Sequence, residues 1–418
     1  MNHATNQPRR FELFEAFGIE LEYMVVDRDT LDVRPVADEV LSLAAGKPTS
    51  DFQDGTITWS NELALHVLEL KATDPVEDLI DLCNSLQKGV RNLHAHLASL
   101  NAVLLPSGMH PWMNPQSETR LWPHECAEIY NAYHEIFDCH THGWSNVQSV
   151  HLNLPFANDG DFARLHAAVR ILLPILPALT AGSPIMDQCR GTWLDMRMRA
   201  VRDHCCRVPF LTGQLIPEPF FDEATYRREI FDGLENAIEP FNASGVFDPN
   251  FLNARGAIAR FDRGSIEVRV MDVQEHPAVD VAVCVAVIAA LKTIVSERWQ
   301  PLSLQKKMGT PTLSGLLDKV SATGERTVID NPDFLRCFAI KDASITAGEL
   351  WRHIISSAED QEPMLGGVKS NLQTILKHGT LATRIVNAVG DDYRREHLQS
   401  VYQQLATCLV EARSFPPT

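Results

Sequence analysis

Two common glycine-rich motifs for binding nucleotide phosphates are absent from this sequence. No GxxxxGK[ST] pattern occurs, because Gly46-Lys47 lacks the upstream glycine and is followed by Pro48, where the loop would have to continue into a helix. The GxGxxG pattern is absent as well. A nucleotide site in this chain would therefore have to be built from something other than a glycine-rich loop.

Basic residues are also outnumbered. The 418 residues include 37 Lys and Arg against 54 Asp and Glu, which gives a formal net charge of -17. Such a charge disfavours nucleic acid and anionic membrane surfaces as partners, because their phosphates would be repelled. A small charged substrate stays compatible with it, since a local site can be positive within a negative protein.

Long apolar runs are lacking too. Residues 1–10 contain no apolar core of the kind that a signal peptide has. The longest apolar stretches, such as 281–291, are much shorter than the roughly 18 to 20 residues that cross a bilayer. We therefore expect a cytoplasmic protein with no membrane partner. The nine cysteines, an odd number without regular spacing, fit reduced thiols better than disulfides.

One stretch has the residue types of a zinc site without its usual spacing. Histidines and cysteines recur across residues 124–142, but neither a CxxC pair nor an HExxH helix is present. Tyr130, His134 and Phe137 fit instead one face of an amphipathic helix. A structural zinc ion in this stretch is an open alternative.

The most informative residues are charged side chains that alternate with apolar ones in strand-like segments. In an extended strand successive side chains point to opposite faces, so Glu20 and Glu22 share a polar face and the apolar residues between them share the other. About 250 residues later, the segment 265–272 repeats the pattern with Glu267 and Arg269. A sheet with carboxylates on one face is suited to hold divalent cations and a polyphosphate.

Two further segments add polar residues to the same sheet. Residues 57–70 are strand-prone at both ends and carry Glu62 and Glu69. Because these two are seven residues apart, they reach one site only if a bulge or turn intervenes. Residues 148–155 alternate cleanly and direct His151 to the polar face. Burying so many carboxylates would be costly without metal ions to neutralise them.

Strand-like and helix-like segments are interleaved along the chain, which predicts a mixed α/β or α+β fold. Apolar residues at helical spacing predict helices from about Asp74 to Leu100, from Arg164 to Leu179 and from Val279 to Val295. The pattern weakens over 301–344 and is helical again from Ala347 to Ser414. In the weak part, Gly309-Thr310-Pro311 and Asn331-Pro332 indicate turns.

Five landmarks in a fixed order resemble those of the glutamate-cysteine ligases. In chain order they are Gly18-Ile19-Glu20-Leu21-Glu22, Glu62 through Glu69-Leu70, Val150-His151-Leu152-Asn153, Ala181-Gly182-Ser183-Pro184, and Ile266-Glu267-Val268-Arg269 through Asp272. The chain is most similar to the bacterial branch that also contains carboxylate-amine ligases of unassigned substrate. The resemblance covers roughly residues 15 to 300, and the helical tail is similar in kind.

This resemblance implies an α+β catalytic domain like that of glutamine synthetase, in which a curved, mostly antiparallel sheet forms a funnel with helices packed behind it. It implies a ligase body over 10–300 and a mainly helical C-terminal segment over 301–418 that packs on the same domain. The funnel would hold ATP and about two or three Mg2+ ions. The metal ligands that it implies are Glu20, Glu22, Glu62, Glu69, His151 and Glu267.

The resemblance also implies roles for three arginines. Arg269 would contact the phosphates and, with Glu267, serve catalysis. Arg197 falls where relatives have an arginine and could bind ATP phosphates or a substrate carboxylate, and Arg255 is a weaker candidate of the same kind. The shape of the loops around the funnel, including parts of 105–145 and 185–220, would determine which amine is accepted.

The implied reaction is amide synthesis through an acyl phosphate. The γ-phosphoryl group of ATP would pass to the acid, and a neutral amine would then displace the phosphate. Family analogy points to the γ-carboxylate of glutamate as the acid and to cysteine as the amine. No cysteine of the chain is required as a nucleophile. A homo-oligomer formed through apolar helices of the last third is left open.

Two other functions fit the same residues. A metal-dependent hydrolase could use the carboxylates and His151 to activate water, and it would turn over without ATP. A non-catalytic nucleotide or small-molecule binding protein could share the fold. Taken singly, Glu20 with Glu22 could be ordinary solvated side chains, and Glu267 with Arg269 a cross-strand ion pair. Their joint occurrence in order favours the ligase.

Overall fold

The computed structural model describes residues 10–242 and 245–416. Residues 1–10, which were expected to form no signal peptide, lie almost wholly outside this part of the chain. Eight strands form the main sheet: β1 Gly18–Asp27, β2 Asp51–Asp54, β3 Ile57–Asn61, β4 Val67–Ala72, β5 Ala102–Leu105, β6 Ser149–Pro155, β9 Ala257–Arg260 and β10 Ser265–Asp272. Two small ribbons pair β7 Ile185–Met186 with β8 Cys189–Arg190, and β11 Val328–Ile329 with β12 Ile345–Thr346.

Helices account for most of the remaining regular structure. In the first two thirds of the described chain they are α1 Ala37–Ala45, α2 Leu79–Ala98, α3 Pro115–Glu118, α4 Ala127–Phe137, α5 His142–Ser145, α6 Asp159–Leu172, α7 Pro177–Thr180, α8 Met196–Asp203, α9 Glu223–Tyr226, α10 Asp232–Ile238, α11 Pro249–Leu252 and α12 Pro277–Val295. Beyond them lie α13 Leu302–Gln305, α14 Thr310–Thr323, α15 Pro332–Arg336, α16 Ala347–Ala358, α17 Leu365–His378, α18 Leu381–Val389 and α19 Arg395–Glu411.

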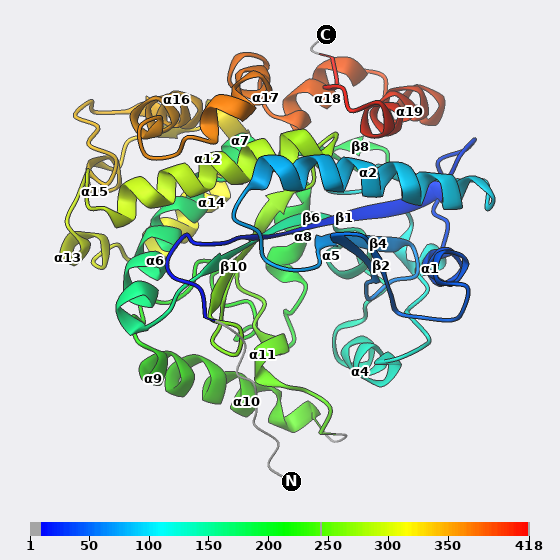
Figure 1. The fold of residues 1–418 in the computed structure, drawn as a ribbon, viewed down its shortest axis with the longest axis horizontal. Helices are drawn as coiled ribbons and strands as arrows, with labels where there is room; N and C mark the ends of the chain where they lie inside the picture. Colours follow the sequence, from blue (N-terminus) through cyan, green and yellow to red (C-terminus); the bar gives the residue numbers. More distant parts are fainter. Residues whose placement is uncertain (1–9, 243–244, 417–418) are drawn as a thin grey trace.

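The main sheet has the strand order β2-β3-β4-β1-β6-β10-β9, and β5 pairs with the second half of β1. Every strand pair in it is antiparallel. Strands and helices belong to one fold in which the sheet is covered by helices (Figure 1). The predicted α+β class with an antiparallel sheet is therefore confirmed.

The strands form as the alternation predicted. Ile19, Leu21 and Tyr23 of β1 have no exposed surface, and they belong to the large core between the sheet and the helices. Ile266 and Val268 of β10 are equally buried in that core. Because side chains alternate along a strand, burying these residues directs the charged residues between them to the opposite face.

Helices α2, α6 and α12 cover the apolar face of the sheet, whereas α4, α10 and α11 lie on its other side (Figure 1). Helix α2 begins later than the sequence suggested, because the carboxylate of Asp78 caps it by accepting the N–H of Ile80 at 2.7 Å. Helix α12 packs against α2 and α6 on one side and against α16 and α17 on the other. A helix enclosed in this way can be apolar all round.

The length of α12 corrects one expectation from the sequence. Among the described residues it is the one helix long and apolar enough to cross a bilayer, although no apolar stretch of that length was expected. Over its most apolar 18 residues, however, 83% are buried inside the structure. Its composition is thus accounted for by its place in the protein core.

Prolines account for two other differences. The helix predicted from Arg164 to Leu179 ends at Leu172, and a 3-10 turn and α7 follow, because Pro174 and Pro177 cannot continue the hydrogen-bond ladder. The turn predicted at Gly309-Thr310-Pro311 is instead the start of α14, where a proline in the first turn is favoured.

The last four helices form the outer layer, coloured orange to red in Figure 1. Helices α16 and α17 contact α12, and α19 contacts α2 and β5. Arg384 of α18 forms a fully buried ion pair with Glu275, which follows β10. The helical character predicted for 347–414 is confirmed, and the division into a body and a packed segment stays a prediction.

Candidate active site

Cross-strand pairing brings the predicted residues together on the polar face of the sheet. Glu20 of β1 lies opposite His151 of β6, and Glu22 of β1 lies opposite Glu69 of β4. On the other side of β6, β10 contributes Glu267 to the same face. Side chains at paired positions of antiparallel strands are close neighbours, so four strands place these five residues in one cluster.

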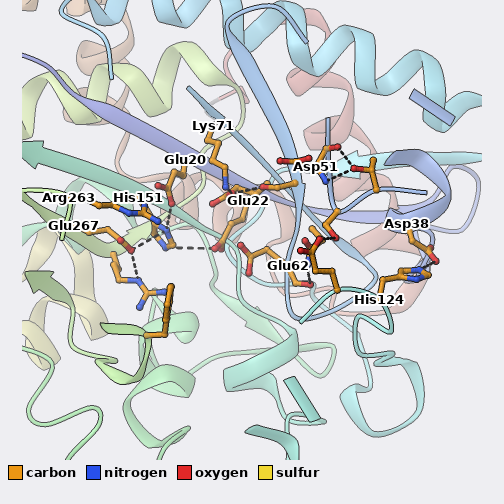
Figure 2. A pocket seen from close by; sticks show the side chains of 18 of the residues that line it. Glu20, Glu22, Asp38, Asp51, Glu62, Lys71, His124, His151, Arg263 and Glu267 are labelled. Carbon is orange, nitrogen blue, oxygen red and sulfur yellow. Dashed lines mark hydrogen bonds and ion pairs between the residues drawn. The ribbon is translucent and has the colours of Figure 1, made fainter. Parts of the chain in front are cut away.

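His151 is the centre of the cluster. Its Nδ1 lies 3.1 Å from Oε2 of Glu20 and 3.7 Å from Oε1 of Glu267, and its Nε2 lies 3.7 Å from Oε1 of Glu22. Ser149 fixes Glu22, because its backbone N–H and its hydroxyl both donate to Oε2, at 2.7 and 2.8 Å. Figure 2 shows these three glutamates converging on the imidazole.

Glu69 is held at the other side of the cluster. The hydroxyl of Ser60 donates to its Oε2 at 2.7 Å, and Lys71 forms a salt bridge with the same oxygen. The candidate ligand atoms of Glu20, Glu69 and His151 all lie within 4.8 Å of one another. These three side chains can therefore contact a single ion.

The bend that the sequence required between Glu62 and Glu69 is present. Strand β3 ends at Asn61 and β4 begins only at Val67, so Glu62 lies in the connection between them. Both glutamates line the same cavity. Sequence reasoning therefore placed all six candidate metal ligands in one region, and their role as ligands stays a prediction.

The crowded charges perturb several pKa values. Burial alone would lower the pKa of His151, but the charge of Glu22 and the hydrogen bond to Glu20 raise it to about 9. Burial, with the charge of Glu20, raises the pKa of Glu69 to about 7. Burial and the neighbouring carboxylates raise the pKa of Glu62 well above its ordinary value. Carboxylates held this close favour binding of a cation, which would lower these pKa values.

A β-bulge positions Arg269. The register between β10 and β6 shifts between Val268 and Met271, and the backbone N–H of Arg269 donates to the carbonyl of Gly256 at 2.9 Å. The guanidinium Nε lies 3.0 Å from Oε1 of Glu267, while 37% of the side chain stays exposed. Bulges often re-aim a side chain next to an active site, and this one leaves a cationic group facing open space.

The cluster lines a polar cavity of about 670 Å3, called here the acidic cavity. Three basic residues that the sequence analysis did not single out also line it: Lys71, Arg260 and Arg263. Lys71 alternates with Glu69 along β4, so the same period-two argument could have found it. Arg260 is the last residue of β9 and Arg263 lies in the connection of β9 with β10, and no motif gave a signal for either.

A second cavity, of about 490 Å3, adjoins the acidic cavity. Its lining is largely apolar and comes mostly from 126–144, 197–215 and 246–256, with further residues from 62–67 and 147–151. The first two segments overlap the loops expected to select the amine. We call it the apolar cavity. The residues that line both cavities are Glu22, Glu62, His151, Phe251 and Arg269. These five residues form the junction between the two cavities.

Arg197 and Arg255 line the apolar cavity and lie outside the acidic cluster. Arg197 forms a buried ion pair with Asp272. Arg255 donates to both carboxylate oxygens of Glu218, at 2.6 and 2.8 Å. The structure thus places both arginines in the wall of the apolar cavity with their charges already paired, and their role as ligand contacts stays a prediction.

The histidine-rich stretch does not converge as a whole. The helix predicted there exists as α4, and His124 and His142 each pair with a distant aspartate, at 2.9 and 3.1 Å. His134, Asp138 and His140 bring candidate ligand atoms within 4.8 Å of one another. Asp138 is exposed and the two histidines are partly exposed, so this trio shows none of the enclosure of the cluster around His151.

The donor set around His151 fits Mg2+. Five glutamates provide hard oxygen ligands, which Mg2+ prefers, and a single imidazole completes the set. The same cavity is lined by basic residues that could contact phosphate oxygens. The residues present therefore suit both a divalent cation and a polyphosphate.

The comparison that decides the family is the match of residues 16–404 to glutamate-cysteine ligase family 2. The chain belongs to this family of ATP-dependent ligases. It is also 33% identical to an uncharacterized protein of Archaeoglobus fulgidus over 280 residues, which cover 67% of this chain and 75% of that one. The sequence-based resemblance is thus confirmed.

Two solved structures share the fold of this ligase. The glutamate-cysteine ligase of Francisella tularensis, in complex with AMP, aligns over 98% of this chain and 91% of that chain, with 13% identity and a TM-score of 0.57. A bifunctional glutathione synthetase of Pasteurella multocida aligns over 94% of this chain and 53% of that chain, with 15% identity and a TM-score of 0.60. At these identities the likeness shows the fold.

Proposed function

We propose that this ligase uses ATP and Mg2+ to join the γ-carboxylate of glutamate to an amine through an acyl phosphate. The observation that carries the proposal is the convergence of five glutamates, His151 and Arg269 on one acidic cavity. Such a donor set suits a metal-bound polyphosphate, and membership of a ligase family supplies the reaction class. A cytoplasmic location is part of this proposal.

In the proposed reaction a carboxylate oxygen of the acid attacks the γ-phosphorus of ATP, and ADP leaves. The amine nitrogen then attacks the acyl carbon, inorganic phosphate leaves with the C–O bonding pair, and the nitrogen loses a proton. Mg2+ held by the six candidate ligands would neutralise charge on the phosphates. Arg269 would contact the transferring phosphoryl group, because its guanidinium is partly exposed at the junction of the cavities.

The first test is ADP release by the full chain with ATP, Mg2+ and glutamate, with and without a panel of amines headed by cysteine. Amine-dependent ADP release with a product of condensed mass supports the ligase. ATP and Mg2+ binding without turnover on any amine would rule out glutamate as the acid. Absence of ATP and Mg2+ binding would contradict the active site itself.

Glu267→Gln tests the site, because it keeps the size of a side chain that contacts both His151 and Arg269 while removing its charge. We expect kcat/KM to fall at least about 100-fold, the scale seen when one electrostatic contact to a transition state is lost. Glu77→Gln, at an exposed position outside both cavities, is the matched control and should leave activity unchanged. Full activity of Glu267→Gln would remove this residue from the site.

A further inference from the structure

The apolar cavity differs in chemistry from the acidic cavity that it adjoins. Aromatic side chains form much of its wall: the rings of Tyr133 and Trp144 are 5.4 Å apart, and those of Tyr133 and Phe247 are 4.9 Å apart. Ile129 and Val201 add aliphatic surface. A pocket of this size with apolar walls suits an organic molecule that has a large apolar part.

Two features make cysteine a poor occupant of this cavity. Cysteine is small relative to about 490 Å3, so most of the apolar wall would gain no contact from it. Its carboxylate would also need a cationic partner. Three arginines line the cavity. Arg197 and Arg255 are almost fully buried and already paired with Asp272 and Glu218. Arg269, at the junction, is paired with Glu267 at 3.0 Å, and its proposed contact is the transferring phosphoryl group.

The junction, in contrast, suits the reacting amine group. Glu22 and Glu62 line both cavities, so their carboxylates face the place where a molecule in the apolar cavity would end. Carboxylates attract an ammonium group and accept its hydrogen bonds. The basic residues Lys71, Arg260 and Arg263 line only the acidic cavity, which assigns that cavity to the phosphates.

We infer that the apolar cavity binds the amine substrate, and that this amine has an aromatic or similarly large apolar body and no carboxylate. The inference rests on the proposed function and adds the substrate class to it. The body of the amine lies among Tyr133, Trp144 and Phe247, and its nitrogen reaches the junction at Glu22 and Glu62.

A panel of four amines tests this assignment with the full chain, ATP, Mg2+ and glutamate: 2-phenylethylamine, ethylamine, phenylalanine and cysteine. Burying a phenyl group in an apolar site favours binding by roughly 10-fold to 100-fold, so kcat/KM for 2-phenylethylamine should exceed that for ethylamine and cysteine by about this factor. Equal or higher kcat/KM for cysteine or ethylamine overturns the inference. A preference for phenylalanine over 2-phenylethylamine overturns the absence of a carboxylate.

A cavity-filling variant tests the location. Ile129 lines the apolar cavity and its neighbour on α4, Glu128, is exposed and lines neither cavity. Ile129→Trp should raise KM for 2-phenylethylamine at least about 10-fold and leave KM for ATP unchanged, while Glu128→Trp changes neither. A rise confined to KM for ATP would assign the cavity to the nucleotide and overturn the inference. Unchanged KM values in Ile129→Trp would overturn it as well. Leu63→Trp, in another wall of the same cavity, serves if the first variant does not fold.

The amine site can be tested separately from the proposed ligase reaction. If no amine supports ADP release, titration calorimetry with 2-phenylethylamine still tests the cavity. Binding by the unaltered chain that Ile129→Trp abolishes and Glu128→Trp retains would support the apolar-amine site. Absence of binding by the unaltered chain would overturn it.

Discussion

The buried ion pair between Glu275 and Arg384 allows a sharp test of how the C-terminal helices are attached. Neither side chain has any exposed surface. The guanidinium of Arg384 donates to both carboxylate oxygens, at 2.6 and 3.1 Å, and also to the carbonyl of Phe415 at 2.8 Å. Glu275 lies three residues after the end of β10, so the pair ties the outer helices to the strand that carries Glu267 and Arg269.

The expected magnitude follows from burial. Arg384→Met would leave the carboxylate of Glu275 buried without its cation, and breaking a fully buried pair on one side costs about 3–5 kcal/mol. That is a large share of the roughly 5–15 kcal/mol by which proteins are stable. Replacing both partners by methionine removes both charges, so the double variant should be more stable than Arg384→Met by about 2 kcal/mol or more.

Urea unfolding, followed by tryptophan fluorescence and far-UV circular dichroism, measures both quantities. If 301–418 packs on the same domain as 10–300, both probes should report one coincident transition. A loss below about 1 kcal/mol in Arg384→Met would refute the argument from burial. An early separate transition of the C-terminal helices would refute the single domain.

Two further predictions concern other buried groups. His110 donates from Nε2 to the carbonyl of Leu31 at 2.7 Å, and burial lowers its pKa to about 4 from the 6.5 of an unfolded chain. As the pH falls from 6.5 towards 4, the unfolded chain takes up a proton that the native protein does not, so stability falls by up to about 1.4 kcal/mol per pH unit. His110→Gln should lessen this slope in urea titrations at several pH values by the share of one group, because His66 and His204, whose pKa values burial also lowers to about 4, keep their own shares. An unchanged slope would contradict the prediction. Asp272 accepts the hydroxyl of Ser183 at 2.7 Å and pairs with Arg197. Asp272→Asn should therefore lower the free energy of unfolding by about 3 kcal/mol or more and also lower kcat/KM. Wild-type stability in this variant would show that the pair contributes little.

The polar face of the sheet was predictable because a strand has only two faces. Once Leu21 and Val268 are assigned to the core, their charged neighbours Glu22 and Glu267 must lie on the other face, and the burial of both strands bears this out. The bend between β3 and β4 followed from the same geometry, since two residues seven apart cannot share a face of one regular strand.

Contacts between distant parts of the chain could not be predicted in this way. The two hydrogen bonds from Ser149 to Glu22 join residues 127 positions apart, and Arg255 reaches Glu218 37 positions away. No periodicity encodes such pairings. The sequence therefore indicated Arg255 as a candidate ligand contact, whereas the structure shows that its charge already has a partner.

The apolar cavity was even harder to predict from the sequence, because its wall combines α4, α8 and α11 with the loops between them. A single pattern of apolar residues in a helix predicts a face packed on the core, and it cannot distinguish a core face from one lining a cavity. Tyr133 illustrates this, since it packs on Phe137 and Trp144 and also lines the cavity.

The junction of the two cavities explains why their contrast in polarity matters for a ligase. In the proposed reaction the amine must reach the acyl phosphate before water hydrolyses it, so such a site would have to admit the amine and exclude water. Phe251 lies at the junction with 62% of its surface exposed, so it offers apolar surface there. Its backbone carbonyl accepts the hydroxyl of Tyr133 at 3.1 Å, which links it to the aromatic wall. An apolar amine body that covers Phe251 would remove water from the junction as its nitrogen meets the acid, so one contact would provide both selection of the amine and protection of the intermediate.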